Sequence, residues 1–247
     1  MTKAQRSKLI FTTIAILLIC LGTYFQNNID RLYNKIMNVT IKSYNIDEIP
    51  EYNGKDFVVI NHNEPEFKEN EYTTKSFEKY SNLDRLGRCG VAYANLSKET
   101  MPKKERQSIG MIKPTGWHTV KYDNIESKYL YNRCHLIGYQ LSGENDNKRN
   151  LITCTRQMNT IGMLQFENKV ASHIKKTNNH VLYRVSPIFK ENDLLARGVQ
   201  IEAYSVEDKG KLKFNVFVYN VQDGIEIDYK TGASKKKINK KVIIWKT

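Results

Sequence analysis

Four polar residues in the middle of the chain have types and spacings that suit the hydrolysis of a phosphodiester. His135 is followed by Asn150, Asn159 and Glu167. A histidine can accept a proton from water near neutral pH, because its ordinary pKa is about 6.5. Amide and carboxylate oxygens suit Mg²⁺, which keeps several waters and needs only one or two protein ligands. Together these residue types predict a metal-assisted attack of water on phosphorus.

Each of these residues has a predicted task. Asn159 and Glu167 are eight residues apart, which on an ideal helix places them within about 80° of each other. We expect Asn159 to give its amide oxygen to the metal and Glu167 to hold metal-bound waters. Asn150 would orient a metal ligand, the histidine or the scissile phosphate. Arg133 and, as a weaker candidate, Arg156 would bind phosphate.

The same residues also have ordinary structural explanations. A histidine at the end of a strand is commonly structural or simply exposed. Asn159 could cap the start of a helix, which is the commonest role of asparagine in helices. Glu167 could lie in solvent, and Arg133 could form a surface ion pair. Residue types alone leave both explanations open.

Hydrophobic patterns predict the elements that would position these side chains. A strand over 129–135 would bring the histidine to its end, and a second strand covers 151–155. A helix over 157–176 follows, with an apolar stripe at spacings of three and four. The stripe consists of Met163, Phe166, Val170 and Ile174. Further strands are predicted at 56–61, 88–95, 180–185, 199–204, 212–219 and 224–229.

Strands on both sides of a central helix predict an α+β fold with a mostly antiparallel central sheet and flanking helices. Between the strands, 63–80 is acidic and predicted to be irregular, and 101–106 is predicted to form a helical turn. The domain is expected to span 56–232, after a stalk at 30–55 and before a basic tail at 233–247.

The charge of the chain is strongly positive and unevenly distributed. The formal net charge is +13, of which residues 1–44 carry +5, residues 45–84 carry −6 and residues 85–247 carry +14. The segment with the candidate site is therefore more basic than the chain as a whole. Such a field attracts polyanions such as nucleic acid or anionic lipid. A merely soluble basic surface would have the same composition.

The N-terminal segment has the pattern of a targeting sequence. Residues 1–8 contain three basic residues, and 9–29 is an uncharged, mostly apolar run. The run is long for the core of a cleaved signal peptide and close to the roughly 20 residues of a membrane span. We expect an uncleaved signal anchor, a transmembrane helix that leaves 1–8 in the cytoplasm and the domain extracellular. A cleaved signal peptide, which would give a secreted protein, is the alternative.

The cysteines leave the disulfide pattern open. Cys20 lies in the apolar run, whereas Cys89, Cys134 and Cys154 lie in the domain without a C-x-x-C pair. Structural zinc is therefore not predicted. Outside the cytoplasm the three domain cysteines permit one disulfide and one free thiol. Three buried free thiols are equally compatible with the sequence, and the spacing does not choose a pairing.

The central motifs resemble those of the DNA/RNA non-specific endonucleases, the ββα-metal nucleases, and most closely the bacterial DNA-entry nuclease type. That family has Asp-Arg-Gly-His or a close variant, then an asparagine before a short strand, a metal-binding asparagine and a glutamate. The matching residues here are Asn132-Arg133-Cys134-His135, Asn150, Asn159 and Glu167. The motifs match in series over roughly 56–232, which is more specific than any one of them alone.

The resemblance implies a fold and a mechanism. A strand pair and the following helix would form the metal site against an antiparallel sheet. His135 would be the general base, and Asn159 would bind Mg²⁺, or Mn²⁺ in its place. Glu167 and Asn150 would support the metal waters and the site geometry, and Arg133 would contact phosphate. DNA, and RNA as well, would be cut with little base preference to leave a 5′-phosphate and a 3′-hydroxyl.

The chain departs from the family pattern at two positions. Asn132 stands where aspartate is usual, and Cys134 stands where glycine is usual. Relatives with this cysteine tend to have a second segment like Gly87-Arg88-Cys89-Gly90. The resemblance therefore implies a disulfide between Cys89 and Cys134, which would leave Cys154 free.

Two other functions fit parts of the sequence. A non-catalytic surface receptor for nucleic acid would use the same basic charge and anchor, but it would not need His135 or Asn159. A structural wall or membrane protein would use the basic tail to hold anionic polymers. Phosphate binding without metal dependence would favour the receptor, and neither binding nor cutting would favour the structural protein. The sequence does not identify an inhibitor protein or DNA-uptake machinery as a partner.

Overall fold

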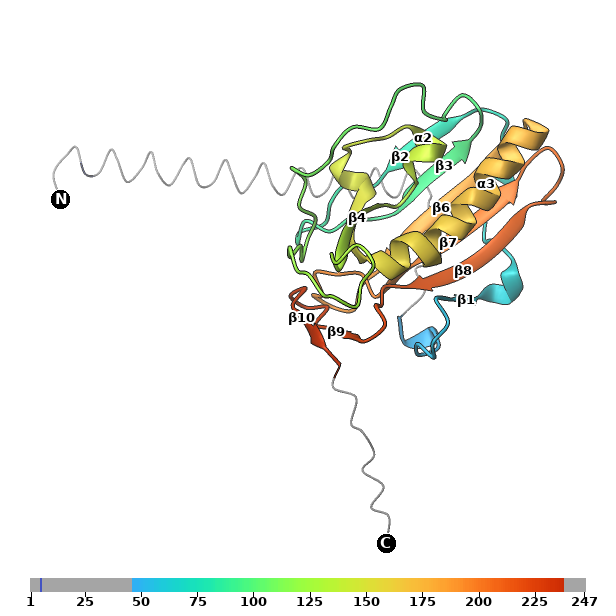
Figure 1. Ribbon diagram of the computed structural model, residues 1–247. Coiled ribbons are helices and arrows are strands. Elements are labelled where there is room, and N and C mark those ends of the chain that lie inside the picture. Colours follow the sequence, from blue (N-terminus) through green and yellow to red (C-terminus); the bar gives the residue numbers. More distant parts are fainter. Residues whose placement is uncertain (1–4, 6–45, 238–247) are drawn as a thin grey trace, which may run out of the picture. The chain divides into compact units, whose positions relative to one another are not determined.

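The computed structural model describes Gln5 and residues 46–237 (Figure 1). The second range belongs to the compact unit Tyr44–Thr247. The predicted anchor at 9–29, most of the predicted stalk and the end of the basic tail lie outside the described residues. Within the part of the chain that is described, no helix combines the length and the apolar character needed to span a membrane.

The centre of the fold is a six-stranded sheet in which all neighbouring strands are antiparallel, as predicted. Its order is β1 (Phe57–Val59), β8 (Lys213–Tyr219), β7 (Gly198–Ser205), β6 (Val181–Ile188), β3 (Ala92–Leu96) and β2 (Phe77–Tyr80). Side chains alternate between the two faces of a strand. In β8, Phe214, Val216 and Val218 pack on one face, whereas Phe217 and Tyr219 pack on the other. The sheet therefore needs cover on both sides.

One face of the sheet is covered by the helix α3 (Leu164–Thr177), which lies along the direction of the strands β6, β7 and β8 (Figure 1). The predicted apolar stripe is confirmed, because all four of its members, Met163, Phe166, Val170 and Ile174, are buried. The ring centroid of Phe166 lies 4.9 Å from that of Phe57 and 5.1 Å from that of Phe214. One aromatic ring thus joins the helix to two strands.

The predicted helix is not a regular α-helix throughout. Its first part, η5 (Met158–Met163), is π-helical, and α3 continues from it. A Cβ atom on Gly162 would collide with Val218, so glycine lets this turn pack directly on β8. Short π-helical segments often occur at functional sites. The angle of about 80° expected between Asn159 and Glu167 assumed a regular α-helix, and for this segment that assumption was wrong.

Two further strands form a separate antiparallel pair that precedes η5 in the chain. They are β4 (Tyr131–His135) and β5 (Leu151–Thr155), and the predicted bounds of β5 are confirmed. His135 lies opposite Leu151 at one end of the pair. Because side chains alternate along a strand, His135 lies on one face and Cys134 on the other. The face with Cys134 packs into the main core.

The disulfide expected between Cys89 and Cys134 was wrong. Cys134 is bonded to Cys154, with 5.9 Å between the Cα atoms, and Cys89 is a buried free thiol. The register of the strand pair explains the difference. Cys134 lies opposite Ile152, so Cys154 is its diagonal neighbour on the same face. The Cys89 sulfur instead donates to the backbone carbonyl of Leu151.

The other face of the sheet is covered by the chain between residues 46 and 76. Ile49, which belongs to the predicted stalk, packs against Phe217. Under this cover the guanidinium of Arg184 binds the carboxylate of Glu202, with Nε 2.6 Å from the nearer oxygen. The covering segment contains three short 3₁₀ turns, η1 (Ile46–Glu48), η2 (Asn61–Asn63) and η3 (Glu69–Glu71).

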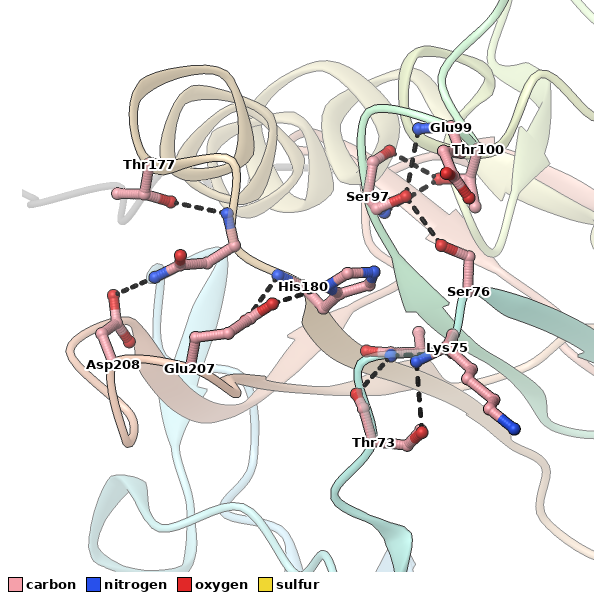
Figure 2. A network of polar contacts seen from close by, with 12 residues as sticks. Thr73, Lys75, Ser76, Ser97, Glu99, Thr100, Thr177, His180, Glu207 and Asp208 are labelled. Carbon is pink, nitrogen blue, oxygen red and sulfur yellow. Dashed lines mark hydrogen bonds and ion pairs between the residues drawn. The ribbon is translucent and has the colours of Figure 1, made fainter.

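Polar contacts join the turn after α3 to the turn between β7 and β8 (Figure 2). The Nδ1 atom of His180 lies 2.6 Å from the carboxylate of Glu207. The neighbouring Asn179 donates to Asp208 at 2.9 Å. These contacts fix the turn that leads from α3 into β6.

Two short strands were not predicted. β2 lies within the acidic segment expected to be irregular, and its Phe77 makes an edge-on contact with Tyr93 of β3, 5.1 Å between ring centroids. β10 (Ser234–Lys236) lies in the expected basic tail and pairs with β9 (Ile225–Ile227). Both strands depend on partners distant in sequence, so local patterns do not reveal them.

The helical turn predicted at 101–106 was also wrong, because this segment forms bends. The hydroxyl of Tyr139 donates to the backbone carbonyl of Lys104 at 2.6 Å. A tertiary contact therefore uses a carbonyl that a helix would have used itself. Tyr139 begins the short helix α2 (Tyr139–Ser142).

Candidate active site

His135 closes β4 and is almost completely buried. Its Nε2 atom lies 2.8 Å from the backbone carbonyl oxygen of Asn145. A carbonyl oxygen only accepts hydrogen bonds, so Nε2 carries the proton and donates it. In the neutral ring the lone pair is then on Nδ1, and this is the atom that can accept a proton from water.

The surroundings of His135 favour its neutral form. Burial lowers the pKa of His135 below the ordinary value of 6.5, and the charge of Arg106 acts in the same direction. Hydrogen bonds with the backbone at Asn145 and Glu144 oppose this lowering of the pKa. A neutral imidazole is the form that acts as a general base.

Asn150 fixes the chain immediately after the histidine. It is fully buried at the end of the 3₁₀ turn η4 (Lys148–Asn150). Its Oδ1 accepts from the backbone N–H of Ile137 at 2.9 Å, and its Nδ2 donates to the carbonyl of Ile137 at 3.0 Å. Both ends of the amide are used inside the protein, so Asn150 orients the backbone beside His135.

Glu167 lies in the first turn of α3 with its carboxylate against Gly138. A Cβ atom on Gly138 would collide with this carboxylate, so glycine makes the close approach possible. Burial raises the pKa of Glu167 to about 7, and the nearby Gln140 amide and Arg106 charge offset only part of that effect. Within residues 46–237 no Lys, Arg or His forms an ion pair with Glu167. A desolvated carboxylate without a counter-ion favours the binding of a cation.

Arg106 is a site residue that the sequence analysis missed. Its charge lowers the pKa of both His135 and Glu167, which places its side chain within electrostatic reach of both. The neighbouring Gln107 N–H donates to the side chain of Asn145 at 3.2 Å, and the carbonyl of Asn145 holds the histidine. The sequence signal for Arg106 is the basic run that ends at this residue, within the segment predicted to form a helical turn.

Arg133 lies two residues before His135 in β4 and is held by the loop that precedes this strand. Its Nε donates to the carbonyl of Ile112, and its Nη2 donates to the carbonyl of Gly110 at 2.6 Å. Its guanidinium lies 4.0 Å from the centre of the Trp117 ring, which is a cation–π contact. Among the described residues Nη1 has no hydrogen-bond partner. The predicted contact of Arg133 with phosphate stays a prediction, and Nη1 is the group available for it.

Asn159 lies in the π-helical segment η5 and is partly exposed. Helical structure already begins at Arg156, so Asn159 is not the residue that caps the helix. In the part of the chain that the structure describes, its amide has no hydrogen-bond partner, and no hydrogen bond connects it to His135. A partly exposed amide without a protein partner is available to a metal ion.

Arg156 is less closely tied to this group. Its Nη2 lies 3.8 Å from the carboxylate of Glu126, which is almost fully exposed. Exposed ion pairs of this kind contribute little to stability. Its predicted contact with phosphate stays a prediction.

The donors in this region fit a hard ion that keeps its waters. Among residues 46–237 there is no group of three or more His, Cys, Asp or Glu side chains that could hold a metal ion. Mg²⁺ does not require such a group, because water completes its coordination. The amide of Asn159 could bind the ion directly, and the carboxylate of Glu167 could hold its waters.

A comparison with known protein families gives a match over the segment that contains these residues. A family of proteins described as DNA/RNA non-specific endonuclease matches residues 68–207. The matched range covers more than half of the chain and contains His135, Asn150, Asn159 and Glu167.

Solved structures of nucleases have the same fold. NucA from Streptococcus agalactiae with magnesium bound is 24% identical, with a TM-score of 0.68 over 87% of this chain and 97% of that chain. Its metal-free form is 24% identical, with a TM-score of 0.67 over 86% of this chain and 96% of that chain. Sda1 nuclease with a bound zinc ion is 25% identical, with a TM-score of 0.61 over 74% of this chain and 97% of that chain.

Proposed function

Because the chain belongs to the DNA/RNA non-specific endonuclease family and is a nuclease, we propose that it hydrolyses phosphodiesters of both DNA and RNA with Mg²⁺. The observation that carries this proposal is the orientation of His135. Its Nε2 is engaged by the carbonyl of Asn145 at 2.8 Å, which leaves Nδ1 as the base. The divalent ions bound in NucA and Sda1 support a divalent ion here.

In the proposed reaction, Nδ1 of His135 accepts a proton from water as the water oxygen bonds to phosphorus. The bond between phosphorus and the 3′-oxygen breaks, and the leaving oxygen takes a proton from solvent. The products are a 5′-phosphate and a 3′-hydroxyl. Mg²⁺, when bound, supplies positive charge at the phosphate and at the leaving oxygen.

The other site residues would prepare this step. Asn150 holds the backbone beside His135, Asn159 would bind the metal, and Glu167 would hold its waters. Arg106 and the free Nη1 of Arg133 would attract the phosphate. Contacts to phosphate carry no direct sequence information, so little base preference is expected.

The metal assignment predicts a specific effect of Asn159→Ala. Loss of the proposed direct protein ligand should raise the Mg²⁺ concentration needed for half-maximal cleavage by about tenfold or more. The measurement is cleavage of plasmid DNA and of single-stranded RNA by the full chain at graded Mg²⁺ concentrations and with a chelator.

The matched control for this titration is Asn70→Ala, because Asn70 is exposed in η3 on the other side of the sheet. Full activity in the chelator would contradict the metal requirement. A wild-type Mg²⁺ response in Asn159→Ala would remove Asn159 as the ligand. Cleavage of DNA but not RNA would restrict the proposed substrate.

We also propose that the domain acts outside the cytoplasm, attached to the membrane by residues 9–29. The Cys134–Cys154 disulfide supports this location, because such bonds persist in oxidising compartments. The three basic residues before the apolar run support the orientation. Protease treatment of intact cells should digest the domain in the membrane fraction. A protected, soluble domain would contradict export, and an intact domain in the medium would show that the segment is cleaved.

A further inference from the structure

A pocket of about 460 Å³ lies beside the candidate active site. Its apolar wall includes Leu83, Met111, Pro114 and Leu151, and two lysines, Lys113 and Lys148, also line it. A volume of this size is within the usual range for small-ligand pockets. None of the proposed catalytic steps uses these side chains.

The pocket shares part of its wall with the catalytic residues. Leu151 is the direct cross-strand neighbour of His135, and such neighbours have Cβ atoms about 4.5–5.5 Å apart. Ile112, which also lines the pocket, gives its carbonyl to Arg133. A group bound in the pocket would therefore lie next to a phosphate held at His135.

The pocket combines exposed apolar surface with unpaired positive charge. Met111 is 73% exposed and Leu83 is 40% exposed. Lys113 and Lys148 are also exposed, and within residues 46–237 neither forms an ion pair with a carboxylate. Large exposed apolar side chains gathered at one place commonly mark a binding site. An apolar wall with two cations suits a ligand that has a flat apolar part and an anionic part.

The two uncharged polar side chains of the wall, Cys89 and Thr115, already form hydrogen bonds inside the protein. The Cys89 sulfur donates to the carbonyl of Leu151 at 3.2 Å, and the Thr115 hydroxyl donates to the carbonyl of Leu194 at 2.6 Å. Neither is free to distinguish one base edge from another. The pocket could therefore hold any base by contact with its ring, which suits a nuclease without sequence preference.

We propose that this pocket binds the nucleotide next to the scissile phosphate in the substrate strand. Its base lies against Met111, Leu83 and Pro114, and its phosphate lies between Lys113 and Lys148. The proposal rests on the proposed nuclease function and identifies a second contact between enzyme and strand. It predicts that affinity depends on both a flanking phosphate and a flanking base.

The charge contact is tested with Lys113→Gln/Lys148→Gln. We expect about a tenfold higher KM for a single-stranded DNA 12-mer and an unchanged kcat, because two phosphate contacts are lost while the catalytic residues stay intact. The control is Lys175→Gln/Lys176→Gln, which removes the same charge from the last turn of α3. Equal increases of KM in both variants would show a general charge effect and overturn the proposal.

The base contact is tested with Leu83→Ser/Met111→Ser. Both side chains are exposed, so the fold should tolerate the change. KM should rise for the ordinary 12-mer but not for an abasic 12-mer, which has the phosphates without the bases. The same rise for both substrates, or no rise for either, would overturn the proposal.

The two proposals can fail separately. A wild-type chain that cleaves no nucleic acid would overturn the nuclease function and the pocket with it. A wild-type chain that cleaves the 12-mer, with all pocket variants behaving like wild type, would overturn the pocket alone.

Discussion

The polar atoms of the site differ in whether the protein already uses them. Nε2 of His135 and both polar atoms of Asn150 have partners inside the protein. The Asn159 amide has none among the described residues. The atoms that form hydrogen bonds inside the protein fix the positions of their side chains, because breaking a buried hydrogen bond is unfavourable. The atoms without partners are those available to water, metal and substrate.

The sequence suggests which residues could form the site, but it does not show how they are hydrogen-bonded. His135, Asn159 and Glu167 could be selected because few residue types can move a proton or bind Mg²⁺. The contact of Arg133 with phosphate stays a prediction, and the sequence did not show that two of its nitrogens bind the carbonyls of Gly110 and Ile112. Arg106 was missed. Both outcomes depend on the path of the loop before β4, which no local pattern encodes.

The effect of Arg106 on the histidine predicts a change in pH dependence. The charge of Arg106 lowers the pKa of His135, so Arg106→Gln should raise that pKa toward its ordinary value. A general base must be unprotonated, so the acid limb of kcat/KM should move to higher pH. The loss of Arg106 also raises the pKa of Glu167, which shifts the limb in the same direction.

The measurement is kcat/KM for DNA between pH 5 and pH 9, at saturating Mg²⁺. Lys175→Gln is the control, because it removes one positive charge from the far end of α3 and should leave the limb in place. An acid limb that stays in place or moves to lower pH in Arg106→Gln would contradict the electrostatic role of Arg106.

Three connected elements, β4, β5 and the helix that begins with η5, carry the site. The two strands and the helix were predicted from apolar runs and a stripe of period 3.6. The π-helical start was not, because it depends on the contact of Gly162 with Val218 in a distant strand. The disulfide was predicted wrongly because pairing depends on register. Only the alignment of Cys134 opposite Ile152 brings it beside Cys154.

The disulfide should contribute strongly to the stability of the strand pair. It joins residues 20 positions apart, and closing a loop of that size stabilises a fold by about 3 kcal/mol. Cys134→Ser/Cys154→Ser should lower the free energy of unfolding in urea by about that amount. Cys89→Ser is the control, because Cys89 is a free thiol. If the double variant is no less stable than Cys89→Ser, the Cys134–Cys154 bond is absent in solution.

Across the whole molecule, the sheet separates two chemically different surroundings. The site elements and α3 pack on one face, and the acidic segment from residue 46 onward packs on the other. The order of strands and helix was enough to predict an α+β fold. The packing of residues 46–76 on the second face was not predicted. It depends on residues far apart in the sequence, such as Ile49 and Phe217, which belong to one buried cluster.

The most direct test of the central claim compares the full chain with His135→Ala in Mg²⁺, measuring both DNA cleavage and DNA affinity. If Nδ1 of His135 is the general base, turnover should fall by about two to four orders of magnitude while affinity stays the same. Wild-type turnover in His135→Ala would contradict the assignment. Binding by both proteins with cleavage by neither would instead identify a nucleic-acid receptor.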